Sequence, residues 1–152
     1  MSKRLQKPGA FIRIPLADGS FGYGRILEPP HSAFYNYRTT SPDSDLDRIT
    51  SKSVIFRIAV RYLSRSRWEF IGWREIESHL AQPVVRFTQD VANFKNCTIF
   101  DAAGNARSAA PEECVGLEAS AVWDQHHVEG RLLDFFMGRP NPNVEFLKVR
   151  LQ

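Results

Sequence analysis

Long apolar runs are missing from this sequence, and their absence excludes one class of protein. No stretch approaches the roughly 18 apolar residues that a membrane-spanning helix needs. The basic start, residues 1–8, is not followed by an apolar stretch long enough for a secretory signal. We therefore expect a cytoplasmic protein that does not enter a membrane.

Cysteine is scarce, with Cys97 and Cys114 as the only two. Neither belongs to a Cys-x-x-Cys pair, and two cysteines in a chain without an export signal are typical of reduced thiols. The neighbouring carboxylate of Glu113 would raise the pKa of the Cys114 thiol, which is the opposite of activation. The sequence thus predicts free, structural cysteines.

Motifs of catalysis and cofactor binding are missing as well. No Gly-x-Ser-x-Gly turn occurs, and Gly19, Gly22 and Gly24 lie in a predicted hairpin rather than before a helix, where a phosphate-binding loop needs them. Among the four histidines, His126 and His127 are adjacent and would point about 100° apart on a helix. We expect no catalytic residue, no metal ligand and no cofactor.

Turn-forming and aromatic residues are plentiful, with 9 Gly, 9 Pro and 11 Phe among 152 residues. This composition favours strands over a helical bundle. The length suits one domain over residues 1–152. We predict a mostly β (α+β) fold: a curved antiparallel sheet or partly open SH3-like barrel, with one C-terminal amphipathic helix and a short second helix.

Alternating apolar residues predict most of the strands. Asp18-Gly19 predicts a type I′ hairpin over residues 10–27, because both central residues of that turn need positive φ. The clearest strand, residues 54–63, is expected to pair with residues 68–73. Further strands are expected at residues 33–37, 84–88, 98–100, a segment after Asn105, and 145–151.

Helix signals occur in three places. Asp124 and Gly138 are suitable caps for a helix over about residues 125–137. One apolar stripe of this helix is predicted to be buried, namely Val128, Leu132, Phe135 and Phe136. A short helix is expected over residues 74–80, and one helical turn inside the polar loop 38–52.

Several short strings, taken in order, resemble the immunity protein 26 family of bacterial polymorphic toxin systems. They span about residues 8–141. The strings are Ile14–Gly19, Tyr23–Leu27, Ala33–Tyr35, Phe56–Val60, Arg67-Trp68, Ile71-Gly72, Phe87, Gln89-Asp90, Pro111–Cys114, Gly116–Glu118, Ala121–Asp124, His127–Glu129, Arg131-Leu132 and Phe136.

The resemblance implies a cytoplasmic antidote that binds a cognate toxin domain, with no catalysis and no cofactor. The recurrent residues are of turn and core types, so contact residues are expected at other positions. The recurrent residues are Pro15, Gly19, Gly24, Trp68, Trp123 and Phe136.

Charge clustering supplies two candidate toxin-binding patches. The net charge is +3, yet acidic residues outnumber basic ones in residues 81–152. An acidic patch would be steered onto the basic surface of a nuclease toxin. The first candidate, the acidic cluster, is Glu112, Glu113, Glu118, Asp124 and Glu129. The second, the aspartate loop, is Asp43, Asp45 and Asp47 flanked by Tyr35 and Tyr37.

Nucleic-acid binding is the alternative function. Arginines and aromatic residues interleave across the predicted pair of strands 54–63 and 68–73, as they do on sheets that stack single-stranded nucleic acids. The residues concerned are Arg57, Arg61, Arg65, Arg67, Arg74, Trp68, Phe70 and Trp73. The competing interpretation places the aromatic rings in the core and the arginines on the solvated face.

Overall fold

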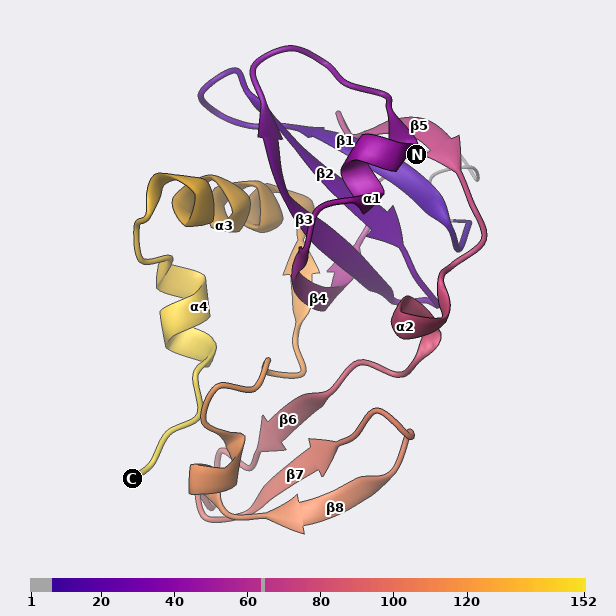
Figure 1. Ribbon diagram of the computed structural model, residues 1–152. Coiled ribbons are helices and arrows are strands. Elements are labelled where there is room, and N and C mark those ends of the chain that lie inside the picture. The colour runs from indigo at the N-terminus through magenta and orange to yellow at the C-terminus, as the bar shows by residue number, and fades with distance from the viewer. Residues whose placement is uncertain (1–6, 64) are drawn as a thin grey trace.

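Two β-sheets and several short helices make up the computed structural model, which describes residues 7–63 and 65–152 (Figure 1). The predicted mostly β class is confirmed, and the larger sheet is not closed into a barrel. In chain order, the elements are β1 Ala10–Pro15, β2 Phe21–Ile26, β3 His31–Thr39, α1 Leu46–Thr50, β4 Val54–Arg61, β5 Glu69–Trp73, α2 Ser78–Ala81, β6 Arg86–Gln89, β7 Cys97–Phe100, β8 Ala106–Ala109, the 3₁₀ helix η2 Pro111–Cys114, β9 Val122–Asp124, α3 Gln125–Met137 and α4 Pro142–Leu147.

The larger sheet has the strand order β5-β1-β2-β3-β4-β9, in which only β4 and β9 are parallel. The predicted β1–β2 hairpin is confirmed, but its turn is not type I′. Leu16 N donates to Ser20 O at 2.8 Å, and Gly19 is the one turn residue with positive φ, at 85°. A longer loop with a single left-handed glycine therefore joins the strands.

The predicted pairing of residues 54–63 with 68–73 is wrong. β5 pairs with β1, whereas β4 pairs with β3 and β9. The reason is the burial of Trp68, whose ring contacts Phe34 and Tyr62 edge-on and whose Nε1 donates to Glu129 at 2.8 Å. The chain after β4 thus crosses the core to the opposite edge of the sheet instead of turning back.

Both faces of the larger sheet are covered. One face packs on α3 through Val128 and Leu132, which are fully buried with Phe34 and Trp68 in the main core. The other face packs on α1 through Ile49, in a cluster with Phe11, Tyr23 and Tyr35. Phe135 does not share the buried stripe of α3, because 47% of it is exposed.

The smaller sheet, in the order β6-β7-β8, has a core of its own. Cys97 and Cys114 are both buried in it as free thiols, as predicted. Burial and the neighbouring Cys97 raise the pKa of Cys114 to about 11. Backbone hydrogen bonds between Phe87 and residues 118–120 connect this sheet to the segment leading into β9.

The C-terminal segment contradicts one prediction. A closing strand was expected over residues 145–151, but residues 145–147 belong to the helix α4. Asn141 caps this helix by accepting a hydrogen bond from Val144 N at 3.0 Å, and Pro142 occupies its first turn. α2 is shorter than predicted, and Asp124 precedes α3 without a side-chain capping bond. No helix in the described ranges is long and apolar enough to cross a membrane.

Candidate protein-binding interface

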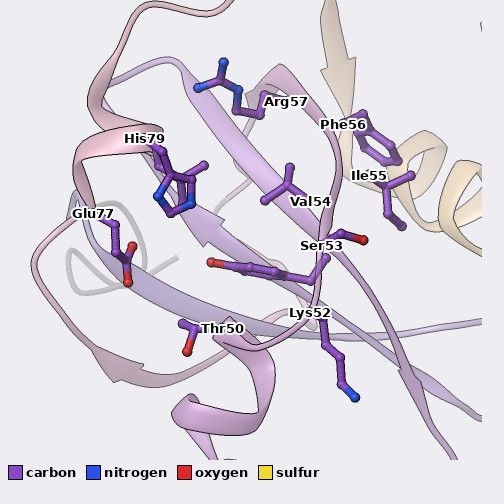
Figure 2. Close-up of a pocket in the computed structure, with 11 residues that line it drawn as sticks. Thr50, Lys52, Ser53, Val54, Ile55, Phe56, Arg57, Glu77 and His79 are labelled. Atoms are coloured by element: carbon purple, nitrogen blue, oxygen red, sulfur yellow. The ribbon is translucent and has the colours of Figure 1, made fainter.

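A groove of about 750 Å³ follows β4 on the side of α2. In Figure 2, Glu77 and His79 lie on one side of it and Val54 on the other, with Arg57 towards one end and Thr50 and Lys52 towards the other. Tyr35 and Leu80 complete the lining. The groove is therefore bounded by a strand, a short helix and the end of the loop that contains α1.

The wall that carries Glu77 is fixed by Arg25, whose side chain is fully buried. Arg25 forms an ion pair with Glu77, and its Nη2 donates to the carbonyl oxygens of Arg74 and Glu75 at 2.8 and 2.9 Å. Its guanidinium carbon also lies 4.0 Å from the centre of the Phe11 ring. These bonds tie residues 74–77 to β2 and give the groove a preformed wall.

Two titratable groups of the groove are affected by this arrangement. Burial works to raise the pKa of Glu77, but its own backbone amide and the Arg25 guanidinium outweigh that effect and lower the pKa. Burial raises the pKa of Tyr35. Glu77 is therefore ionised but neutralised by Arg25, and Tyr35 stays an uncharged phenol at neutral pH.

Sequence reasoning missed most of this groove. Lys52, Glu77 and His79 belong to no motif, and they come together because α2 folds back over β3 and β4. One signal was present: an arginine inside the otherwise apolar and glycine-containing strand β2. A buried arginine needs several acceptors, so it marks a place where distant backbone segments must meet.

The acidic cluster is distributed over η2, the segment before β9 and the start of α3. Four of its five carboxylates already have partners within the chain. Glu113 pairs with Arg107, Glu118 with Arg131, Asp124 with Arg61, and Glu129 accepts from Trp68. Arg61 lowers the pKa of Asp124 by hydrogen bonding. Glu112 is exposed. The role of the cluster in toxin binding stays a prediction.

The carboxylates of the aspartate loop also have partners within the chain. Asp43 accepts hydrogen bonds from the Tyr37 hydroxyl and Arg48, and the hydrogen bond from Tyr37 is the main cause that lowers its pKa to about 2. Asp45 caps α1, and Asp47 pairs with Arg74 at 2.7 Å. Tyr35 is only 2% exposed, so of the predicted contact residues it is the one placed in the core, with its side chain lining the groove. Toxin contact by this loop also stays a prediction.

The arginine and aromatic residues of the nucleic-acid alternative do not share one strand pair. Arg57 and Arg61 lie on β4, whereas Phe70 and Trp73 lie on β5 at the opposite edge of the sheet. Trp68 is buried, as the competing interpretation expected. The platform from which that alternative was inferred is thus not formed.

The adjacent histidines differ from expectation in their geometry. The ring centres of His126 and His127 lie 4.0 Å apart, so the side chains converge rather than diverge. Within residues 7–63 and 65–152, no group of three or more His, Cys, Asp or Glu residues is arranged to hold a metal ion.

The sequence of this chain matches a known protein family. The family model described as immunity protein 26 matches residues 7–98, a stretch that includes β1 to β6 and every residue lining the groove. The strings at residues 111–136 that resembled the family lie outside this match. No curated protein and no solved structure matches the chain. The match extends over more than half of the sequence, and the chain belongs to the immunity protein 26 family.

Proposed function

We propose that this chain acts in the cytoplasm as the antidote to a cognate polymorphic toxin domain, which it neutralises by binding without chemical change. Family membership is the observation that carries the proposal, since immunity proteins as a class act on toxin partners. The architecture is compatible with inhibition by binding, because it offers a preformed groove whose wall is fixed by Arg25.

Inhibition by binding requires only a protein–protein interface of ordinary size. A stable protein–protein interface buries roughly 800 Å² on each partner and depends on a few aromatic or arginine anchors. The groove and the adjoining part of β4 supply an arginine, a lysine and a histidine around an apolar floor. Rigid partners lose little conformational entropy on binding, so a preformed site favours high affinity.

A nuclease is the toxin class proposed from the acidic cluster and the aspartate loop, because nucleases carry basic surfaces. Charge reversal at Glu112 and at Asp47, whose side chains are exposed, tests this proposal. Slower association with a nuclease domain would support it, whereas an unchanged association rate for both variants would remove the reason for naming a nuclease.

Co-expression tests the antidote function directly. We expect the toxin domain in a large secreted protein encoded in an adjacent reading frame, and this domain is expressed with or without the present chain. We expect growth arrest by the toxin alone, rescue by co-expression, and co-purification of the two proteins. Continued growth arrest together with no complex would contradict the proposal.

The nucleic-acid alternative is tested by a gel-shift assay with generic single-stranded RNA and DNA. Binding that weakens steeply with salt would favour that alternative. We expect no shift at physiological ionic strength.

A further inference from the structure

β4 is paired over only part of its outer edge. On one side it pairs with β3 along residues 54–59. On the other side, β9 pairs only with Ala59, Val60 and Arg61. Residues 54–58 of β4 therefore have a free edge on the side away from β3. Unpaired strand edges are templates for the addition of another strand.

The outward backbone groups at this edge include those of Arg57. Val60 N donates to Pro30 O at 3.1 Å, so the amide of Val60 points towards the β3 side. Because amides alternate in direction along a regular strand, those of Phe56 and Ile58 point the same way and that of Arg57 points outwards. The register with β3 shifts between Phe34 and Tyr35, so Ile55 is the extra residue of a bulge, where this alternation is interrupted. Arg57 lies opposite Ala33 of β3, and the pairing of β4 with β9 begins only at Ala59.

Open space follows this edge along its length. The groove described above is lined by residues 53–57, and a second cavity of about 220 Å³ is lined by residues 57–59. Arg57 lines both, so the two spaces run end to end beside the strand. An extended segment of about five residues fits this length at roughly 3.3 Å per residue.

Three cations border the same edge without an acidic partner. Lys52 lines the groove, Arg86 lines the second cavity, and Arg57 lies between them. Within the described part of the chain, none of the three is within salt-bridge distance of a carboxylate, although most of the other arginines are. The one carboxylate of the groove, Glu77, is neutralised by Arg25. His31 stays neutral near these cations, since burial, Arg86 and Arg57 lower its pKa.

We propose that an extended acidic segment of the toxin adds to the larger sheet as a strand beside β4, pairing with the backbone of Arg57 and placing its carboxylates against Lys52, Arg57 and Arg86. This inference rests on the proposed function and names the surface that performs it. Main-chain pairing supplies affinity in such complexes, and the flanking charges supply selectivity and association rate.

A protein strand fits this surface better than a nucleic acid does. Phosphates would satisfy the cations, but they would leave the outward backbone groups of Arg57 unpaired. Single-stranded nucleic acids also need exposed aromatic faces for stacking. The aromatic residues along the edge, Tyr35 and Phe56, are buried.

Amide hydrogen exchange measured by NMR is the first test, with the toxin domain from the adjacent reading frame as the ligand. We expect exchange at Arg57 to slow at least about tenfold on binding. The amides of Phe56 and Ile58, which face β3, are the internal controls and should be protected in both states. Unchanged fast exchange at Arg57 in a saturated complex would overturn the inference.

A matched pair of double variants tests the charges. Lys52→Gln/Arg57→Gln should lower the association rate about tenfold at low salt. Arg65→Gln/Lys95→Gln removes the same net charge from exposed cations outside the groove, and it should change the rate less than about twofold. Equal effects of both variants would contradict the proposed placement of the segment.

The results of these experiments distinguish a failure of this inference from a failure of the proposed function. A wild-type chain that neither binds nor neutralises the toxin domain would overturn both. A wild-type chain that neutralises the toxin while the exchange and rate tests fail would overturn only the β4 edge. Salt-dependent binding of a 20-nucleotide single-stranded RNA that is lost in Lys52→Gln/Arg57→Gln would assign the cations to nucleic acid and overturn the inference.

Discussion

Arg25 has a fully buried side chain whose hydrogen-bond partners include three groups in residues 74–77. A further bond from its Nε to Gly9 O fixes the start of β1. A buried arginine is stabilising only while all of these acceptors are present, because each lost partner leaves a desolvated polar group. At the scale of residues, the groove thus depends on one cation that no partner protein can reach.

The first prediction concerns this side chain. Arg25→Met should lower the free energy of unfolding by about 3 kcal/mol, because Glu77 and three carbonyl oxygens lose their donor. Urea unfolding measures the loss. Arg107→Met is the matched control, since it breaks the exposed pair with Glu113 and should have a far smaller effect. A loss for Arg25→Met no larger than that of the control would contradict the structural role.

Asp43 gives a prediction about pH. Its pKa is lowered from 3.8 to about 2, mainly by the hydrogen bond from Tyr37. A carboxylate with a lowered folded-state pKa stabilises the fold above its unfolded-state pKa and loses that contribution as the pH falls. The thermal stability of the wild type should therefore drop between about pH 5 and pH 2 more steeply than that of Asp43→Asn. Parallel stability curves for the two proteins over this window would contradict the assignment.

At the scale of elements, close packing between strands controls the geometry of the larger sheet. A Cβ atom added at Gly24 of β2 would lie 2.9 Å from the Phe34 ring and 3.1 Å from Ala33 O. At Gly130 in α3, an added Cβ meets nothing within 4 Å. The same substitution should therefore have opposite effects at the two positions.

We expect Gly24→Ala to lower the free energy of unfolding by about 1–3 kcal/mol through overpacking. Gly130→Ala should raise it by up to about 1 kcal/mol, because alanine favours the helix. Chemical denaturation of both variants measures the difference in sign. Stabilisation by Gly24→Ala would show that β2 and β3 are less closely packed than the structure indicates.

Local elements were predictable from the sequence, whereas their partners were not. The β1–β2 hairpin and α3 depend on residues near one another in the chain, such as Gly19 and Gly138 at their turns and caps. The partner of β5 depends on where Trp68 is buried, which involves residues from several other elements. The alternating apolar residues of 145–151 led to the prediction of a closing strand. Asn141 and Pro142 are signals for the start of a helix, and a helix forms there.

The candidate site was less predictable still, because its residues are unremarkable in sequence. The predicted toxin-binding patches were chosen because aspartates and glutamates cluster in the sequence. In the structure, most of these carboxylates form ion pairs with arginines. The groove instead joins β4 to α2, and the three cations that line it and the neighbouring cavity are separated by stretches of chain that only the fold brings together. Sequence patterns do not show which distant residues the fold brings together.

At the scale of the whole molecule, the two sheets meet beside β4. Residues 118–120 bond to Phe87 of the smaller sheet and then lead into β9, which pairs with β4. The free edge of β4 in the larger sheet therefore lies near the smaller sheet. Lys52 lines the groove towards one end of this edge, and Arg86 lines the cavity towards the other. The family match ends at residue 98, so it includes both of these cations.

The central claim is that this chain inhibits a toxin by binding alone. Its most direct test is a titration of the purified toxin domain's activity with this protein, followed by dissociation of the complex in denaturant, refolding and mass spectrometry of the toxin. We predict complete inhibition at a fixed stoichiometric ratio, full recovery of activity after separation, and an unchanged toxin mass. Inhibition at substoichiometric amounts with a lasting change in toxin mass would contradict the account.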